Sequence, residues 1–276
     1  MYHKILYIFL ITFLCFSCSK KEIVIEKPSE QSKSFELYQD AVDAMNKGEF
    51  FYASKKFSEA ELILPKLDYS AKASLMSSYC LYTINFYDEA IENLNRYVKK
   101  YPASKEISYA KYLIIISLYE QILDETKDIT PLKTTKEKIL TFIIEYPDTE
   151  YTLDLKFKLD LINNQLAAKE LYVAKYYIQT KKWIPAINRL KTIVEEYEKT
   201  IFIEEALHRL VEIYYSLGLD EEAISAAAIL GYNYNSSEWY ERSYKVLNKN
   251  YKIVKKTDDK KRDGLLKRTI KDLLDR

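Results

Sequence analysis

Residues 166–200, LAAKELYVAKYYIQTKKWIPAINRLKTIVEEYEKT, contain the pattern that best indicates how the chain folds. Two small residues, Ala174 and Ala186, stand twelve positions apart, and the apolar Leu190 and Ile193 follow the second by four and seven. Such spacings place residues on one face of an α-helix. Two antiparallel helices joined by a short turn pack closely when the residues at their crossing are small. The stretch therefore predicts a helix-turn-helix pair.

The same pattern recurs along the chain. The other small pairs are Ala41/Ala53, Ser78/Ala90, Val211/Ala223 and, stretched to 25 positions, Ala110/Thr135. The apolar residues that follow by four and seven are Phe57/Ala60, Leu94/Tyr97, Ile139/Phe142 and Ala227/Leu230. Each unit is predicted to close twelve positions after its second small residue, at Pro65, Pro102, Pro147, Glu198 and Asn235. A proline at that point cannot continue a helix.

Composition excludes several classes of protein. The 276 residues include 4 Gly, 26 Tyr and 11 Phe, and 42 Lys+Arg nearly balance 41 Asp+Glu. So few glycines exclude Gly-rich phosphate-binding loops and disfavour sheets built on tight hairpins. A net charge of +1 argues against nucleic acid as the main partner. What remains is an all-α protein, with Gly48 and Gly218 expected at the turns inside two helix pairs.

The repeated pairs resemble tetratricopeptide repeats, whose period is about 34 residues. The second small residues of successive pairs are 37, 45, 51 and 37 positions apart. The step of 45 contains a loop at 124–131, and the step of 51 contains an unbroken helical pattern over 152–180. The predicted fold is a right-handed tetratricopeptide-repeat solenoid of about five repeats, with repeats 1–3 at 35–148 and repeats 4–5, including the long linking helix, at 149–250.

The N-terminus is predicted to be a lipoprotein signal peptide, residues 1–17. Residues 5–16 carry no charge, yet twelve residues are too few to cross a membrane as a helix. Ser17-Cys18 resembles the lipobox of bacterial lipoproteins, although Cys15 stands where these usually have Leu, and the resemblance predicts lipidation of Cys18. The alternative is an ordinary signal peptide cleaved nearby. Residues 18–34 are mostly polar and are predicted to be a flexible tether.

No residue pattern typical of an enzyme or a metal site stands out. With Cys15 removed and Cys18 lipidated, Cys80 has no disulfide partner and is predicted to be a buried apolar residue. His208 has Glu204 and Glu212 one turn away and is predicted to form a surface ion pair rather than a metal site. We therefore expect no catalytic residue, no cofactor and no metal.

Taken together, these features resemble the BamD family of outer-membrane assembly lipoproteins. The likeness rests on the signal, the five repeats, the closures Tyr101-Pro102 and Tyr146-Pro147, the third-repeat loop, the long helix, the stretch at 166–200 and GYNYNSSEWY at 231–240. It covers roughly residues 35–247. The chain departs from the family pattern at Leu64-Pro65, Glu198 and Asn235.

The resemblance implies a non-enzymatic scaffold subunit of the outer-membrane β-barrel assembly (BAM) complex, lipid-anchored on the periplasmic side of the outer membrane. Its implied partners are a BamA-like barrel subunit, accessory BAM lipoproteins and unfolded outer-membrane proteins. The alternative is another periplasmic tetratricopeptide lipoprotein, acting as an adaptor in cell-envelope or cell-division complexes.

Site residues follow from the same resemblance. Arg189 matches the Arg of the family's Ala-x-x-Arg and is expected to bind the periplasmic domain of the barrel subunit, with Asn188 and Trp183 on the same surface. The alternative for Arg189 is an ordinary surface residue, solvated or paired with an acid on a neighbouring helix. Tyr38 and Tyr69 are the aromatic residues best placed to line a substrate groove, and the alternative for each, which the sequence favours, is a packing residue.

The C-terminal tail, 251–276, differs from the body. Residues 255–276 hold nine Lys/Arg and five Asp/Glu. Leu265, Leu266, Ile270, Leu273 and Leu274 fall on one broad helical face. The pattern predicts a short amphipathic helix that docks on a partner or touches anionic lipid, and the alternative is a disordered solubilising tail.

Overall fold

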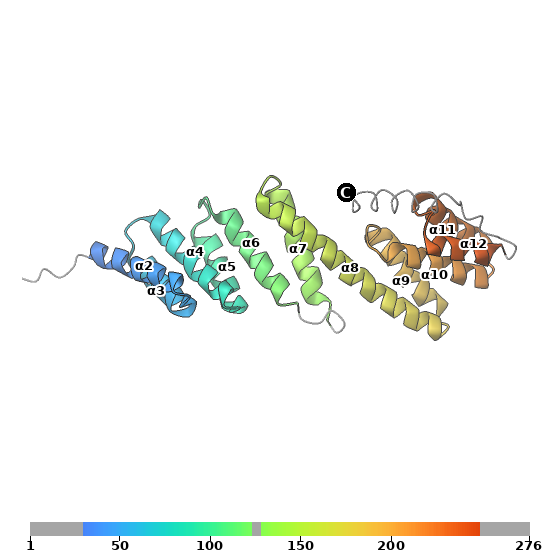
Figure 1. The fold of residues 1–276 in the computed structure, drawn as a ribbon, viewed down its shortest axis with the longest axis horizontal. Coiled ribbons are helices and arrows are strands. Elements are labelled where there is room, and N and C mark those ends of the chain that lie inside the picture. Colours follow the sequence, from blue (N-terminus) through green and yellow to red (C-terminus); the bar gives the residue numbers. More distant parts are fainter. Residues whose placement is uncertain (1–29, 123–127, 249–276) are drawn as a thin grey trace, which may run out of the picture. The chain divides into compact units, whose positions relative to one another are not determined.

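The computed structural model describes residues 30–122 and 128–248, and these residues are helical with short connections (Figure 1). The chain forms two compact units, 1–117 and 118–276, and each is described by itself. The predicted signal peptide, Cys18 and the tail from 249 onward lie outside the described residues. So does most of the predicted loop at 124–131.

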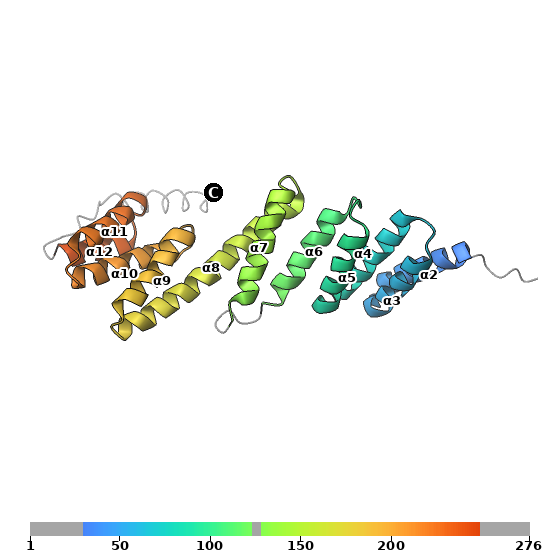
Figure 2. The same cartoon turned by 180° about the vertical axis from the view of Figure 1, so that it is seen from behind.

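The described part of the first unit, from residue 30 onward, contains five helices. They are α2 (Glu30–Asn46), α3 (Phe50–Ile63), α4 (Leu67–Thr83), α5 (Tyr87–Lys100) and α6 (Ile107–Glu120), the last of which runs across the boundary between the units. Consecutive helices from α2 to α5 pack against one another in antiparallel order (Figures 1 and 2). Because α2 begins at Glu30 and Ser34 is buried, the folded part starts inside the segment 18–34 that the sequence predicts to be a tether.

The second unit contains six further helices between residues 128 and 248, the part that the structure describes. They are α7 (Thr130–Glu145), α8 (Glu150–Gln179), α9 (Trp183–Glu196), α10 (Ile203–Ser216), α11 (Asp220–Asn233) and α12 (Glu238–Leu247). The 30-residue α8 confirms the long helix predicted over 152–180. It packs against α7 and α9, and α10, α11 and α12 pack against one another at the C-terminal end of the unit.

The small residues lie at the helix crossings, as predicted. All ten members of the five pairs, from Ala41/Ala53 to Val211/Ala223, are at most 1% exposed. The apolar residues four and seven positions later are also buried. Four of the pairs lie on helices that pack within one compact unit, α2/α3, α4/α5, α8/α9 and α10/α11. There the small side chains let the helix axes approach, and the apolar residues fill the seam beside them. This confirms that the repeat pattern in the sequence encodes the packing.

The turns inside four repeats share one backbone conformation. Gly48 and Gly218 have φ of 81° and 72°, and Asn85 and Lys181 have φ of 63° and 56°. Each stands five positions before the second small residue of its pair. Glycine adopts this left-handed region at little cost, whereas a lysine is strained there. The turn is therefore set by the packing of the two helices, and Lys181 adopts it despite its side chain.

Proline is not what ends the second helices. α3, α5 and α7 end two residues before Pro65, Pro102 and Pro147, but α9 and α11 end at the equivalent point before Glu198 and Asn235. In four of the five helices the capping residue is a tyrosine, whose backbone N–H donates to the carbonyl four residues earlier. Tyr101 and Tyr197 are buried. The second helix therefore ends at this position whether or not a proline follows.

Candidate functional site

The predicted binding residue Arg189 lies on the exposed side of α9 and is held by α8. Its Nη1 donates to the carboxylate of Glu170, at 3.0 Å to Oε2 and 3.2 Å to Oε1. The Arg189 side chain is 47% exposed and that of Glu170 is 13% exposed. The structure thus shows the ion pair with a neighbouring helix that the sequence leaves open as an alternative. A guanidinium carries five N–H donors, so this contact leaves donors directed at solvent.

Asn188 and Trp183 do not share one surface with each other. Asn188 is exposed and its carbonyl accepts from the Thr192 hydroxyl, whereas Trp183 is half-buried at the first residue of α9. Five residues apart on a helix correspond to about 140° around its axis. Asn188 is therefore exposed beside Arg189, while Trp183 lies on another side of α9 and is half-buried.

The two tyrosines of the predicted groove have different environments. Tyr38 is half-buried, and its ring meets the edge of the buried Phe57 ring at 5.3 Å between centroids. Tyr69 is 43% exposed, packs edge-on against Phe35 at 5.6 Å and has the Lys66 ammonium 5.8 Å from its ring centre. Tyr38 is thus a packing residue, and Tyr69 presents ring surface to solvent.

The first unit contains a buried carboxylate that was not predicted from the sequence. Glu61 on α3 is 3% exposed. Its Oε1 accepts from Lys100 Nζ and from the Tyr101 hydroxyl, each at 2.9 Å, and Arg96 Nη2 lies 3.2 Å from Oε2. Burial opposes ionisation, but the hydrogen bonds from Lys100 and Tyr101 and the charge of Arg96 outweigh it, so the pKa of Glu61 lies below its usual value. The group joins α3 to the end of α5.

The sequence carried a signal for Glu61. It stands eight positions after the second small residue of its repeat, where the other repeats have Val98, Ile143, Val194 and Gly231. A charged residue at a position that is otherwise apolar or small needs a charged partner when it is buried.

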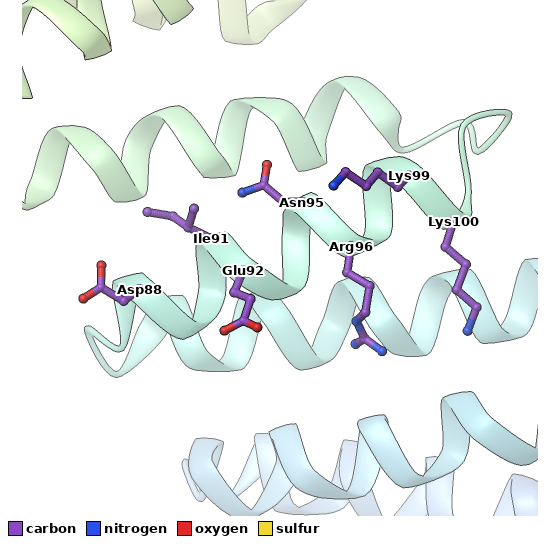
Figure 3. Close-up of a pocket in the computed structure, with 7 residues that line it drawn as sticks. All are labelled: Asp88, Ile91, Glu92, Asn95, Arg96, Lys99 and Lys100. Carbon is purple, nitrogen blue, oxygen red and sulfur yellow. The ribbon is translucent and has the colours of Figure 1, made fainter.

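Arg96 and Lys100 also line an open pocket of ≈ 670 Å³ on α5 (Figure 3). The other lining residues are Asp88, Ile91, Glu92, Asn95 and Lys99. In Figure 3 Arg96 and Lys100 point to the same side of α5, one turn apart. Since both cations reach Glu61, the pocket surface is less basic than its three positive side chains indicate, and it is not a strong anion site.

His208 contacts Glu212, as the sequence predicts, but the predicted surface position is wrong, because the ring of His208 is buried. His208 is 3% exposed, its Nδ1 is 2.9 Å from the Ser243 hydroxyl of α12, and its ring centre is 5.2 Å from that of Trp239. Glu212 lies 3.4 Å from His208 Nε2 and 2.8 Å from Arg209 Nη1. The hydrogen bond with His208, followed by that with Arg209, lowers the pKa of Glu212 to about 2 despite partial burial.

These contacts fix α12 to α10. A helix of ten residues makes little stable structure alone, so α12 depends on packing against its neighbours. His208 is buried because α12 packs against it. The spacing of His208 and its glutamates on α10 does not reveal this contact.

The described residues, 30–122 and 128–248, show neither a metal-binding cluster nor a membrane-spanning helix. Within them no group of three or more His, Cys, Asp or Glu side chains is arranged to hold a metal ion. The helices in these ranges are also too short or too polar to cross a membrane.

Comparison with known proteins gives a consistent result. The model of the YfiO family, described as "Outer membrane lipoprotein", matches residues 30–229. The chain is 35% identical over 238 residues to "Outer membrane protein assembly factor BamD" of Caulobacter vibrioides, covering 86% of this chain and 76% of that protein. It is 35% identical over 215 residues to the protein of the same name from Rickettsia prowazekii, covering 78% and 85%.

One solved structure, titled "Crystal structure of PilW, widely conserved type IV pilus biogenesis factor", aligns with a TM-score of 0.31 at 16% identity, over 76% of this chain and 97% of that chain. This similarity is too low to bear on function.

Proposed function

The chain belongs to the YfiO family of outer membrane lipoproteins, and we propose that it acts in outer membrane protein assembly as a non-enzymatic scaffold subunit of the β-barrel assembly complex. The observation that carries the proposal is the 35% identity to two proteins named BamD over most of this chain. The stacked helix pairs support a scaffold role, because such arrays present long helix faces to protein partners.

The proposal includes attachment to the periplasmic side of the outer membrane through a lipid on Cys18. The Ser17-Cys18 pattern behind a short apolar segment supports it. Mass spectrometry of the N-terminal peptide should locate the lipid on Cys18, and Cys18→Ser should move the chain from the membrane fraction to the soluble fraction. A Cys18→Ser chain that stays with the membrane would contradict this anchor.

Affinity purification from detergent-solubilised envelopes tests the assembly function directly. A large β-barrel subunit with a periplasmic domain should co-purify with the chain at a near-constant ratio. Purification of peptidoglycan or cell-division enzymes in its place would favour the adaptor function. Repeated absence of any barrel protein would contradict membership of the assembly complex.

Within that complex, Arg189 is proposed to bind an acidic residue on the periplasmic domain of the barrel subunit, with Asn188 beside it. The half-exposed guanidinium and its spare N–H donors support this assignment. Glu170 positions the group, since its carboxylate anchors Nη1 and leaves the rest of the fork facing outward.

A charge swap separates the binding role of Arg189 from its ion pair with Glu170. Arg189→Glu alone removes both, whereas Glu170→Arg combined with Arg189→Glu restores an ion pair of reversed polarity. If the barrel subunit needs the positive charge, the swapped chain should bind as weakly as Arg189→Glu. Recovery of binding by the swap would show that Arg189 acts only within the chain. Arg242→Glu is the matched control, because Arg242 is equally exposed at 48% and also pairs with a glutamate.

Tyr69 is the proposed contact for unfolded outer-membrane proteins in the first unit. Its exposed ring beside Phe35 supports this, because aromatic surface suits the alternating apolar residues of a β-strand. Tyr69→Ala should reduce crosslinking to an unfolded barrel substrate. Tyr172→Ala, which removes a tyrosine that is 71% exposed in the other unit, should not. Equal effects of the two variants would contradict the assignment.

A further inference from the structure

An apolar stripe on α11 is left exposed at the end of the second unit. Ile224 is 58% exposed, Tyr232 is 89% exposed, and Ala228 between them is also exposed. The three residues are four positions apart, so they follow one side of the helix over its whole length. Ile229 beside them is 41% exposed. We call Ile224, Ala228, Ile229 and Tyr232 the α11 stripe.

The equivalent side of an earlier helix is covered by the next helix in the chain. On α3 the residues one and five positions after the second small residue are Ser54 and Ser58, and both hydroxyls hydrogen-bond to Ser77 of α4, at 3.0 and 2.8 Å. On α11 these positions are Ile224 and Ala228. The repeat geometry therefore marks this side of α11 as one against which a following helix packs.

α12 covers only one part of α11. A Cβ added at Gly231 would lie 2.8 Å from the Tyr240 ring, so the start of α12 is in close contact with the C-terminal half of α11. Ile224 is seven residues before Gly231, two turns away on the same side. α12 ends at Leu247 after ten residues, and Ile224 stays more than half exposed. Apolar side chains at this position favour a further covering element.

We propose that residues 264–276 of the same chain pack on the α11 stripe as an amphipathic helix. Leu265, Leu266, Ile270, Leu273 and Leu274 supply the apolar face. A helix of these residues would be about 20 Å long, which matches the roughly 21 Å of α11. The intervening residues 248–263 could span about 50 Å when extended, far more than is needed to return from the end of α12 to its neighbour α11.

Charge also favours this occupant. The first turn of α11 contains Asp220, Glu221 and Glu222. The tail carries Lys267, Arg268 and Lys271 between its apolar residues, and residues 255–276 as a whole have four more basic than acidic side chains. Opposite charges beside an apolar contact select its orientation and disfavour a like-charged partner. The inference does not depend on the proposed assembly function.

Crosslinking in the full mature chain tests the contact and identifies the occupant. A Tyr232→Cys, Leu273→Cys chain should form an intramolecular disulfide about tenfold faster than a Tyr172→Cys, Leu273→Cys control, because only the first pair is held together. Tyr172 is 71% exposed on α8 and is as open to oxidation. Adding Leu266→Ser and Ile270→Ser should abolish the difference. Equal rates for the two pairs would overturn the proposal, and so would a disulfide that forms mainly between two chains.

Amide hydrogen exchange gives an independent measurement without introduced cysteines. In the full mature chain, residues 220–233 should exchange about tenfold more slowly than in the Leu266→Ser, Ile270→Ser variant, while α3 should be unchanged as an internal reference. Identical exchange of α11 in the two chains would overturn the proposal. Protection that appears only when a partner protein is added would overturn it as well, by assigning the stripe to that partner.

Discussion

Replacement of Glu61 tests how the first unit is held together. Glu61→Gln keeps an acceptor near Lys100 and Tyr101 but removes the charge. Two charge-assisted contacts become ordinary hydrogen bonds, a loss of about 1–2 kcal/mol. The larger penalty of a broken buried ion pair does not apply in full, because the Arg96 and Lys100 side chains are 45% and 46% exposed and stay hydrated.

A truncation at the same position should cost more. Glu61→Ala also removes the acceptor of the Tyr101 hydroxyl, and Tyr101 is 3% exposed. A buried hydroxyl without a partner adds about 1–2 kcal/mol, so we expect a total loss of about 3 kcal/mol. Glu59→Gln is the matched control on the same helix, since Glu59 is 52% exposed and its pair with Lys56 should contribute less than about 0.5 kcal/mol.

The assay is urea unfolding followed by two signals. Far-UV circular dichroism reports both units, whereas both tryptophans, Trp183 and Trp239, lie in the second. With a slope of roughly 2 kcal/mol per M, Glu61→Gln should lower the midpoint seen by circular dichroism by about 0.5–1 M. Tryptophan fluorescence should shift less. A shift for Glu61→Gln no larger than that for Glu59→Gln would show that the buried charge of Glu61 does not stabilise the first unit.

The sign of the pH dependence follows from the lowered pKa of Glu61. A carboxyl group with a depressed folded-state pKa contributes stability above its unfolded pKa of about 4.3 and loses it as the pH falls through the folded value. The stability difference between the native chain and Glu61→Gln should therefore be constant above about pH 5 and should shrink below about pH 4.

Three further measurements follow. Burial raises the pKa of the Cys80 thiol to about 11, so alkylation at pH 8 should be slow in the native chain and fast in urea, and rapid native labelling would contradict its burial. Lys181→Gly should stabilise the second unit by about 1 kcal/mol and Gly218→Ala should destabilise it by a similar amount, because both positions have positive φ. Thermal unfolding measures both changes. An increase in stability on Gly218→Ala would show that the turn relaxes to another backbone conformation. Because the pKa of Glu212 is lowered to about 2, acidification from about pH 4 to pH 2 should loosen the packing of α12 and change Trp239 fluorescence. The Glu212→Gln chain should show no such change between about pH 4 and pH 2.

The helix pairs could be predicted because their pattern is local and repeated. Small residues twelve positions apart, apolar residues four and seven positions later and the closing position after each second helix all proved to mark packing or helix ends. Periodicity of this kind records which side of a helix is buried. It also located the long helix α8, since no residue between 152 and 180 breaks a helix.

The side-chain partners could be predicted less well. His208 was expected beside its own-helix glutamates at the surface, but α12 covers it, through Ser243 and Trp239. Of the two residues predicted beside Arg189, Asn188 is exposed as Arg189 is, whereas Trp183 is half-buried. The burial of His208 depends on a helix that is distant in the sequence, and the local spacing of residues does not reveal that contact.

Local patterns suffice to predict the all-helical class, the number and spacing of the helix pairs and the family, because these depend on periodic small and apolar residues and on motifs that each lie within a short stretch. Which charges are buried and paired depends instead on how the helices pack in the folded chain. Glu61 meets Lys100 and Tyr101 nearly forty residues later, and Arg189 meets Glu170 across the seam of α8 and α9. A charge is tolerated in a buried position only where a partner from another helix compensates for the lost hydration. The packing of whole helices sets which partner reaches it.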